Sequence, residues 1–296
     1  MIKSPIISQQ PFVPHLFEAL DPSEQSMMDP SEYAEYVEWF EQCKDATFER
    51  IVYLSDGLRV VGVISRPRDI AGAQQRYPVI IYNHGGAGES GKVTVRELYK
   101  KIYPFVKLGY AVVASQYRGN DGSEGKDEVG GGDVDDVINL YPVIQSLSYA
   151  DCENIFMVGF SRGAINTYRA LQKNLLPIKA CAVMSGLSDL FLFEKLRPDM
   201  LPLLEHFIPN YHANRVAELT KRSAVCWAQD ILVPVLLLHG SADSVVDVSS
   251  SEHMARKLAE YNKHYALIIY TGAEHSLDMY RDQATAEIHK WFLRYT

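Results

Sequence analysis

Residues 157–166 read MVGFSRGAIN, which places Ser161 between Gly159 and Gly163. The apolar run 154–160 before the serine is typical of a β-strand, and residues 162–174 after it have a helical pattern. A sharp strand-to-helix turn exposes a serine above the sheet but crowds its neighbours, so glycine is favoured two residues before and after it. The stretch therefore predicts a nucleophilic serine on an α/β sheet. Because G-x-S-x-G is common by chance, the prediction needs a base, an acid and an oxyanion hole elsewhere.

Short apolar runs alternate with helical patterns from residue 77 to the end of the chain. Predicted strands cover 77–86, 110–119, 154–160, 178–186, 233–240 and 265–272, and predicted helices cover 94–109, 132–148, 162–174, 250–263 and 282–295. Continuous apolar strands that alternate with helices indicate a mostly parallel central sheet with helices on both faces. Ligands of such sheets bind at the carboxyl ends of the strands.

The chain before and within this alternation carries two additional segments. Residues 1–46 are predicted to be an N-terminal helical extension, with a helix over 30–45, and a single α/β domain is predicted to cover 47–296. That domain opens with strands over 47–55 and 58–67, whose connecting Asp56-Gly57 is a hairpin signal. The insertion at about 187–230, rich in Leu, Phe, Tyr and Pro, exceeds a simple crossover, so we expect a small helical cap over the strand ends.

Composition restricts the class of protein and its partners. The chain has 296 residues and a net charge of -8, which disfavours nucleic acid and anionic membrane as partners. No segment approaches the roughly 18 apolar residues of a membrane span, and the first residues do not resemble a signal peptide. The four cysteines are scattered without a C-x-x-C pair, so we expect reduced thiols, a cytoplasmic protein, no metal and no cofactor. Oligomeric state stays open.

The base and the acid are sought after the serine, in loops that follow later strands. His275, between the last strand and the last helix, agrees with the Ser…Asp…His order of this type of fold and is the predicted base. Asp243 follows the strand 233–240 and is the predicted acid, which would hold the histidine's tautomer. Asp189 is the second candidate for the acid, and Asp247 is expected to cap the following helix instead.

An oxyanion hole needs two backbone donors close to the serine. One is the N–H of Arg162, the residue after the nucleophile, and the other should come from the loop NHGGAGES at 83–90. We assign the second donor to Gly86, with Gly85 as the alternative, because glycine lets the backbone approach a ligand closely. His84 and His239 are expected to brace their loops rather than act as bases.

Acidic residues at the start of the helix 132–148 have a structural explanation. Asp133 and Asp136 lie in its first turn, where carboxylates complement the helix dipole. Arg118, at the end of an earlier strand, is predicted to pair with one of them and lock the loop between. A contact of Arg118 with a substrate carboxylate is the less favoured alternative.

Several segments together resemble the α/β-hydrolase superfamily, and in order they look most like the catalytic domain of the prolyl oligopeptidase group. They read NHGG (83–86), YRGN (117–120), GGGDVDDV (130–137), GFSRG (159–163), HGSAD (239–243) and EH (274–275). The resemblance covers roughly residues 47–296. It implies an α/β-hydrolase fold with Ser161 as nucleophile, Asp243 as acid and His275 as base. Ala164 departs from the pattern, since the group usually has a further glycine there.

The predicted function is a serine hydrolase that cleaves an ester or amide bond of a small substrate through an acyl-enzyme. The chain has no room for the β-propeller that many peptidases of this group carry, and small esterases fit its length better. We therefore expect a carboxylesterase ahead of a peptidase acting on short peptides. The alternative from another class is a hydrolase fold used only for binding, which the presence of all three triad residues disfavours.

Overall fold

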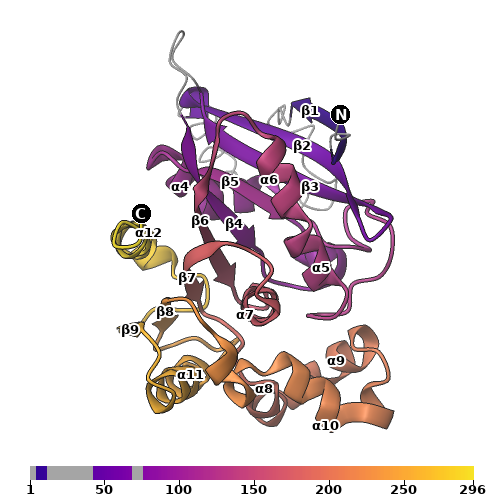
Figure 1. Ribbon diagram of the computed structural model, residues 1–296. Helices are drawn as coiled ribbons and strands as arrows, with labels where there is room; N and C mark the ends of the chain where they lie inside the picture. The colour runs from indigo at the N-terminus through magenta and orange to yellow at the C-terminus, as the bar shows by residue number, and fades with distance from the viewer. Residues whose placement is uncertain (1–4, 12–42, 69–75) are drawn as a thin grey trace, which may run out of the picture.

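The structure is a computed structural model that describes residues 5–11, 43–68 and 76–296. These residues form one nine-stranded sheet with helices packed on it. The sheet order is β1-β2-β3-β5-β4-β6-β7-β8-β9 (Figure 1). The strands are β1 (Ile6–Pro11), β2 (Ala46–Ser55), β3 (Leu58–Pro67), β4 (Tyr77–Asn83), β5 (Ala111–Ser115), β6 (Ala150–Phe160), β7 (Ile178–Met184), β8 (Val235–Gly240) and β9 (Tyr265–Tyr270).

The strand directions confirm the predicted architecture. From β5 through β4 to β9 every neighbouring pair is parallel, whereas β1, β2 and β3 join as antiparallel strands. The predicted hairpin is present, because β2 and β3 pair with Ser55 opposite Leu58. Its two turn residues, Asp56 and Gly57, have φ of 51° and 83°, the left-handed conformations that a tight hairpin requires.

The N-terminal segment differs from its predicted helical character where it is described. Ile6–Pro11 forms β1, which pairs antiparallel with β2 and is therefore part of the same sheet. The physical reason is that β2 would otherwise leave a row of unpaired backbone groups at the sheet edge. The predicted boundary at residue 46 thus does not separate this strand from the sheet. The helix predicted over 30–45 falls mostly outside the described residues, and its last three, Cys43–Asp45, form a 3-10 turn.

Helices cover both faces of the sheet, as predicted. Alternate residues of each central strand face opposite sides. Ile81 belongs to an apolar cluster that includes side chains of α5, α6, α7 and α11, while its neighbour Ile80 belongs to a second cluster that includes side chains of α4 and α12. Figure 1 shows α5 to α7 on one side of the sheet and α4 and α12 on the other. These helices are α4 (Tyr103–Lys107), α5 (Asp133–Ile138), α6 (Leu140–Ser146), α7 (Gly163–Lys173), α11 (Ser249–Glu260) and α12 (Arg281–Phe292).

Two helices predicted as regular depart from that pattern: one contains a π-helical turn, and the other is divided. The segment 94–109 consists of α3 (Val95–Glu97), a π-helical turn (Leu98–Ile102) and α4, and Pro104 lies in the first turn of α4. The segment 132–148 divides into α5 and α6 at Asn139, three residues before Pro142. A proline lacks the N–H that continues a helical hydrogen-bond ladder, which explains why the regular α-helix changes close to these two residues.

The insertion at 187–230 is helical, and it packs on loops at the carboxyl ends of the strands. It contains α8 (Leu190–Leu196), α9 (Leu201–Phe207) and α10 (Tyr211–Arg222). Its apolar side chains form a third cluster that includes Ala87, after β4, and Val246, after β8. Figure 1 shows the three helices side by side, beyond the end of the sheet from which α7 begins.

Candidate active site

Ser161 lies at the junction between β6 and α7, in the strained turn that the sequence predicts. Its φ of 54° is in the left-handed region, which a residue other than glycine rarely adopts. A Cβ at Gly159 would lie 2.5 Å from Thr167 Oγ1, and a Cβ at Gly163 would lie 2.0 Å from the carbonyl oxygen of Asn83. Both positions therefore accept only glycine without a shift of their surroundings. The turn leaves Ser161 8% exposed.

The structure brings Ser161, His275 and Asp243 together from three separate loops. His275 Nε2 lies 2.9 Å from Ser161 Oγ, and His275 Nδ1 lies 2.7 Å from Asp243 Oδ2. These contacts are arranged as a base that can take the serine proton and an acid that holds the base. The carboxylate is fully buried, while the imidazole is 19% exposed. Water can therefore reach the histidine but not the acid.

The Asp243 carboxylate is held in its charged form by its hydrogen-bond donors. Burial alone would raise its pKa, but hydrogen bonds from His239 and His275 hold the pKa well below its usual range. Asp243 Oδ1 also accepts from the backbone N–H groups of Val245 and Val246, each at 2.9 Å. His239 braces this loop as the sequence suggests, because its Nε2 donates to the carbonyl of Val246 at 2.8 Å. The acid is thus charged and fixed in orientation.

The other acids considered for this position contact different groups. Asp189 caps α8, accepting from the N–H groups of Phe191 and Leu192 at 3.1 Å, and it pairs with His253 at 2.8 Å. Asp247 accepts from the N–H of Ser249 at 2.9 Å, within the turn that begins α11. Neither contacts His275, whereas Asp243 does.

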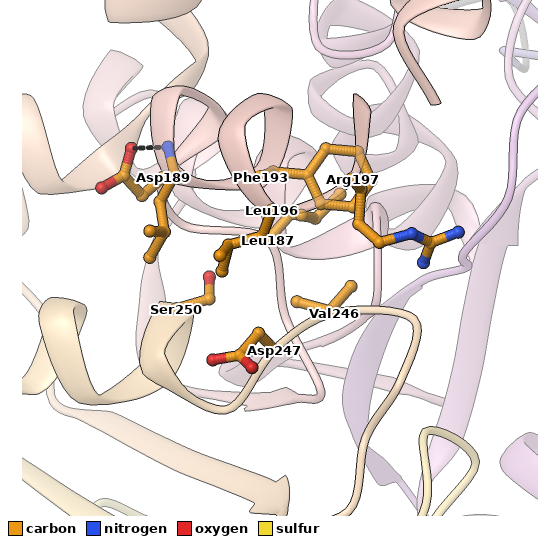
Figure 2. Close-up of a pocket in the computed structure, with 9 residues that line it drawn as sticks. Leu187, Asp189, Phe193, Leu196, Arg197, Val246, Asp247 and Ser250 are labelled. Carbon is orange, nitrogen blue, oxygen red and sulfur yellow. Dashed lines mark hydrogen bonds between the residues drawn. The ribbon is translucent and has the colours of Figure 1, made fainter. Parts of the chain in front are cut away.

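Asp189 and Asp247 also line a small pocket next to the insertion. Figure 2 shows Asp189 hydrogen-bonded to the backbone of α8 on one side and Asp247 in the loop before α11 on the other. Ser161, His275 and Asp243 are not among the residues that line this pocket. The lining residues are Leu187, Asp189, Leu192, Phe193, Leu196, Arg197, Val246, Asp247 and Ser250.

The two predicted oxyanion donors have free N–H groups. Among the residues that the structure describes, the backbone N–H groups of Arg162 and Gly86 have no hydrogen-bond acceptor. Gly85 lies directly against the nucleophile, because a Cβ there would be 2.9 Å from Ser161 Cβ. The loop 83–90 therefore reaches the serine, and either glycine could approach a ligand closely.

His84 sets the orientation of the peptide between Gly85 and Gly86. Burial lowers the pKa of His84 to about 4, so the ring is neutral near pH 7 and its Nδ1–H donates to the Gly85 carbonyl at 2.9 Å. In a trans peptide the N–H points opposite to the C=O, so the N–H of Gly86 faces away from the His84 ring. The choice of Gly86 rather than Gly85 as the second donor stays a prediction, and the contact of His84 with the Gly85 carbonyl agrees with a bracing role.

Arg162, the residue after the serine, belongs to a buried charge cluster whose pairing the sequence did not assign. The Arg162 guanidinium, 5% exposed, pairs with Asp127 and, at 2.8 Å, with Asp133. Arg118 pairs with Asp136 at 2.8 Å, so the prediction that Arg118 pairs with one of the two helix-start acids is confirmed. The positions of the acids in the sequence could not show which acid pairs with which arginine, because all three acids lie within residues 127–136.

Lys101 is a second residue near the site that the sequence did not single out. It lies in the π-helical turn, and its ammonium donates to the carbonyl of Ser276, next to His275, at 2.5 Å. The same ammonium lies 4.2 Å from the ring centre of Phe160, and burial lowers its pKa. A lysine in a helical segment is expected to face solvent, because lysine side chains are seldom buried. The sequence therefore offered no reason to expect a contact between Lys101 and the loop that carries His275.

Two further observations concern metals and membranes. Within residues 5–11, 43–68 and 76–296, no three His, Cys, Asp or Glu side chains are grouped so that they could hold a metal ion. No helix in the described part of the chain is long and apolar enough to cross a membrane.

Comparison with known proteins gives the family. A model of the prolyl oligopeptidase family matches residues 96–296. The chain belongs to the prolyl oligopeptidase family. Membership in this family confirms the predicted α/β-hydrolase fold and the prediction that the protein is an enzyme, a serine hydrolase.

Two curated relatives described as peptidases agree with this assignment. The uncharacterized peptidase YtmA of Bacillus subtilis is 29% identical over 213 residues, which are 72% of this chain and 80% of YtmA. The uncharacterized peptidase YuxL of the same organism is 25% identical over 77% of this chain, but the match spans only 35% of YuxL.

Two solved structures show the same fold. Pyrococcus horikoshii acylaminoacyl peptidase matches with a TM-score of 0.71 at 22% identity, covering 89% of this chain and 43% of that one. The acetyl xylan esterase from Paenibacillus sp. R4 matches with a TM-score of 0.66 at 17% identity, covering 86% of this chain and 85% of that one. At these identities the likeness concerns the fold alone.

Proposed function

We propose that this protein hydrolyses ester or amide bonds of small substrates through an acyl-enzyme formed on Ser161. The observation that carries the proposal is the hydrogen-bonded chain from Ser161 through His275 to Asp243, with contacts of 2.9 and 2.7 Å. A serine hydroxyl is a weak nucleophile unless an adjacent base takes its proton. In this geometry His275 is that base, and the buried Asp243 stabilises the imidazolium that forms.

The two half-reactions use the same groups in reverse order. Ser161 Oγ attacks the substrate carbonyl while His275 Nε2 accepts the proton, and the N–H groups of Arg162 and Gly86 stabilise the negative charge on the carbonyl oxygen. His275 then protonates the leaving alcohol or amine, and the acyl group stays on Ser161. A water molecule then gives a proton to His275 and attacks the acyl-enzyme. As the bond to Ser161 Oγ breaks, His275 returns the proton to Ser161, and the acid is released. No metal or cofactor takes part in this scheme.

The insertion 187–230 is proposed to cover the site and to fix the loop that carries the acid. Arg197, at the end of α8, donates to the carbonyls of Ser244 and Val245 at 3.1 and 2.8 Å, directly after Asp243. Phe207 approaches the loop 83–90, since a Cβ at Gly88 would lie 3.0 Å from its ring. The insertion thus contacts both the acid loop and the oxyanion loop, and its side chains would limit substrate size. The functional unit in this proposal is 47–296 together with β1.

A second candidate function is a peptidase that acts on short peptides. The family match and the relative YtmA, described as a peptidase, favour it. The acetyl xylan esterase shares the fold over most of both lengths, and this likeness does not decide between ester and peptide substrates. The net charge of -8 supports a small-molecule or short-peptide substrate rather than nucleic acid. Localisation in the cytoplasm remains part of the proposal, consistent with cysteines that form no disulfide among the described residues.

The substrate experiment compares two panels on the same preparation. One panel contains p-nitrophenyl esters of increasing acyl length, and the other contains arylamides of free and N-acylated amino acids. We expect ester turnover that Ser161→Ala abolishes, with the preferred acyl length revealing the pocket size. Faster Ser161-dependent turnover of the arylamides would establish the peptidase instead. Absence of Ser161-dependent turnover, together with absence of labelling by an active-site fluorophosphonate, would leave a binding protein.

A further inference from the structure

The oxyanion hole of the proposed mechanism is assembled from two loops that are far apart in the chain. Arg162 belongs to the turn that begins α7, and Gly86 belongs to the loop after β4. Hydrogen bonds to a developing oxyanion require both N–H groups within a few tenths of an ångström of their proper places. Some part of the fold must therefore hold the two loops at a fixed separation.

Asp127 contacts both loops at once. It lies between β5 and α5, and its side chain is 2% exposed. Its Oδ1 accepts from the guanidinium of Arg162 and, at 3.0 Å, from the N–H of Val129. Its Oδ2 accepts at 3.1 Å from the N–H of Gly88, two residues after Gly86, and from Asn120 Nδ2 at the same distance. One carboxylate thus joins the side chain of one donor residue to the backbone beside the other.

We propose that Asp127 is a positioning residue that holds the two halves of the oxyanion hole in register. It touches neither Ser161 nor His275, so its effect on the reaction is transmitted through Arg162 and the loop 83–90. This inference rests on the proposed function.

Tyr117 forms a second connection between the same two loops. The Tyr117 ring stacks on the His84 ring with a centroid separation of 4.1 Å. The Arg162 guanidinium lies 4.5 Å from the centre of the Tyr117 ring. Its hydroxyl donates to the carbonyl of His84 at 3.3 Å. Tyr117 has a φ of 61°, a strained conformation for a tyrosine that persists only where surrounding contacts hold it. The region around Asp127 is therefore built to fix Arg162 against the oxyanion loop.

Both oxygens of Asp127 act as acceptors, and this determines the choice of variant. Burial disfavours the charged form, but the Arg162 guanidinium and the N–H of Val129 outweigh it and hold the pKa of Asp127 below its usual value. Asparagine has nearly the same shape but only one acceptor oxygen, so in Asp127→Asn an NH2 group must face either Arg162 or the N–H of Gly88. Arg162 keeps its pair with Asp133, so the guanidinium is not left unpaired when Asp127 is neutralised.

The experiment measures kcat and KM of Asp127→Asn on an ester that the wild-type protein hydrolyses, with active sites counted by fluorophosphonate labelling to completion. Loss of one oxyanion donor lowers kcat by about a hundred- to a thousandfold. In Asp127→Asn the donor is displaced rather than lost, so we expect kcat to fall by about ten- to a hundredfold and KM to change little. A peptide-like boronic acid or trifluoromethyl ketone, which places an oxyanion in the hole, should lose affinity by the factor by which kcat/KM falls. Asp135→Asn is the matched control, because Asp135 is in the same segment but pairs with Lys173 on the surface.

The outcomes separate this inference from the proposed function. Wild-type kcat in Asp127→Asn, or a reduced kcat with unchanged affinity for the transition-state analogue, would overturn the positioning role while leaving Ser161 as nucleophile. If Asp127→Asn does not fold, Arg162→Lys is measured instead, since it keeps the backbone donor and the charge but loses the planar fork. The same selective loss in kcat is expected there, and wild-type kcat overturns the inference. Absence of Ser161-dependent hydrolysis in the wild type defeats the proposed function, and this inference with it.

Discussion

His275 Nε2 lies 2.9 Å from Ser161 Oγ, although the two residues are 114 positions apart in the chain. Parallel strands end at the same edge of the sheet, so the loop after β9 lies at the same edge as the turn after β6, although β7 and β8 separate the two strands. The contact has the length of an ordinary hydrogen bond. The base is therefore positioned before a substrate arrives, and each prediction below tests one part of that arrangement.

The acid can be tested against its neighbour in the same loop. Asp243→Asn keeps the shape of the side chain but removes the acceptor that fixes the His275 tautomer, so kcat should fall on the order of ten-thousandfold. Asp247→Asn, four residues later, should leave kcat nearly unchanged, because within the described part of the chain its carboxylate is hydrogen-bonded to Ser249, in the turn that begins α11, and not to His275. The measurement is ester hydrolysis normalised to labelled active sites. Similar activities in the two variants would show that Asp243 is not the acid.

The strained turn around the serine predicts an unequal response to two glycine substitutions. A Cβ at Gly163 would lie 2.0 Å from the carbonyl oxygen of Asn83, whereas a Cβ at Gly109 would meet nothing within 4 Å. Gly163→Ala should therefore lower the free energy of unfolding by more than about 2 kcal/mol, or prevent folding. Gly109→Ala should cost only about 1 kcal/mol, from its positive φ of 90°. Urea unfolding of both variants checks this, and equal stabilities would show that the turn is not crowded.

Burial of neutral His84 predicts a pH dependence of stability. Its pKa is lowered from 6.5 to about 4 in the folded protein, so between these values the unfolded chain binds a proton that the folded protein does not. Above pH 6.5 the His84 ring is neutral in both states and does not lower the free energy of unfolding. As the pH falls from 6.5 towards 4, the unfolded chain takes up a proton and the free energy of unfolding decreases. Between neutral pH and about pH 5 the loss attributable to His84 should be about 2 kcal/mol.

The variant His84→Asn isolates this contribution, because its other ionisable groups are those of the wild type. Urea unfolding of both proteins at neutral and acidic pH gives the free energy of unfolding in each state. We expect the wild type to lose more stability on acidification than the variant does. Identical losses would show that His84 takes up its proton in the folded protein as readily as in the unfolded chain.

The fold and the triad could be predicted from the sequence because their signals are local. Gly159 and Gly163 are required by the conformation of one turn, and that requirement is visible as a five-residue pattern. His275 and Asp243 could be chosen because alternating strands and helices determine which loops share an edge of the sheet. Asp189 also follows a strand and satisfies the same order, so the order alone did not exclude it; the structure places Asp189 with His253 instead.

Other features depend on contacts that no local pattern records. The π-helical turn before Pro104 and the division of a predicted helix near Pro142 were visible in principle, since proline interrupts the helical ladder, but the hydrophobic periodicity continues across both. The strand β1 forms because β2 offers it an open edge, which is a property of the assembled sheet. The pairing of Arg162 with Asp127 joins residues 35 positions apart, and its role next to the oxyanion loop appears only in three dimensions.

The most direct test of the central claim is covalent labelling by a fluorophosphonate probe, followed by mapping of the modified peptide by mass spectrometry. The linkage of Ser161 to His275 and Asp243 predicts stoichiometric modification of Ser161 in the wild type. It predicts no modification in Ser161→Ala and strongly slowed modification in His275→Gln, which lacks the base. A wild-type protein that resists the probe, or that is modified at a serine other than Ser161, would contradict the account.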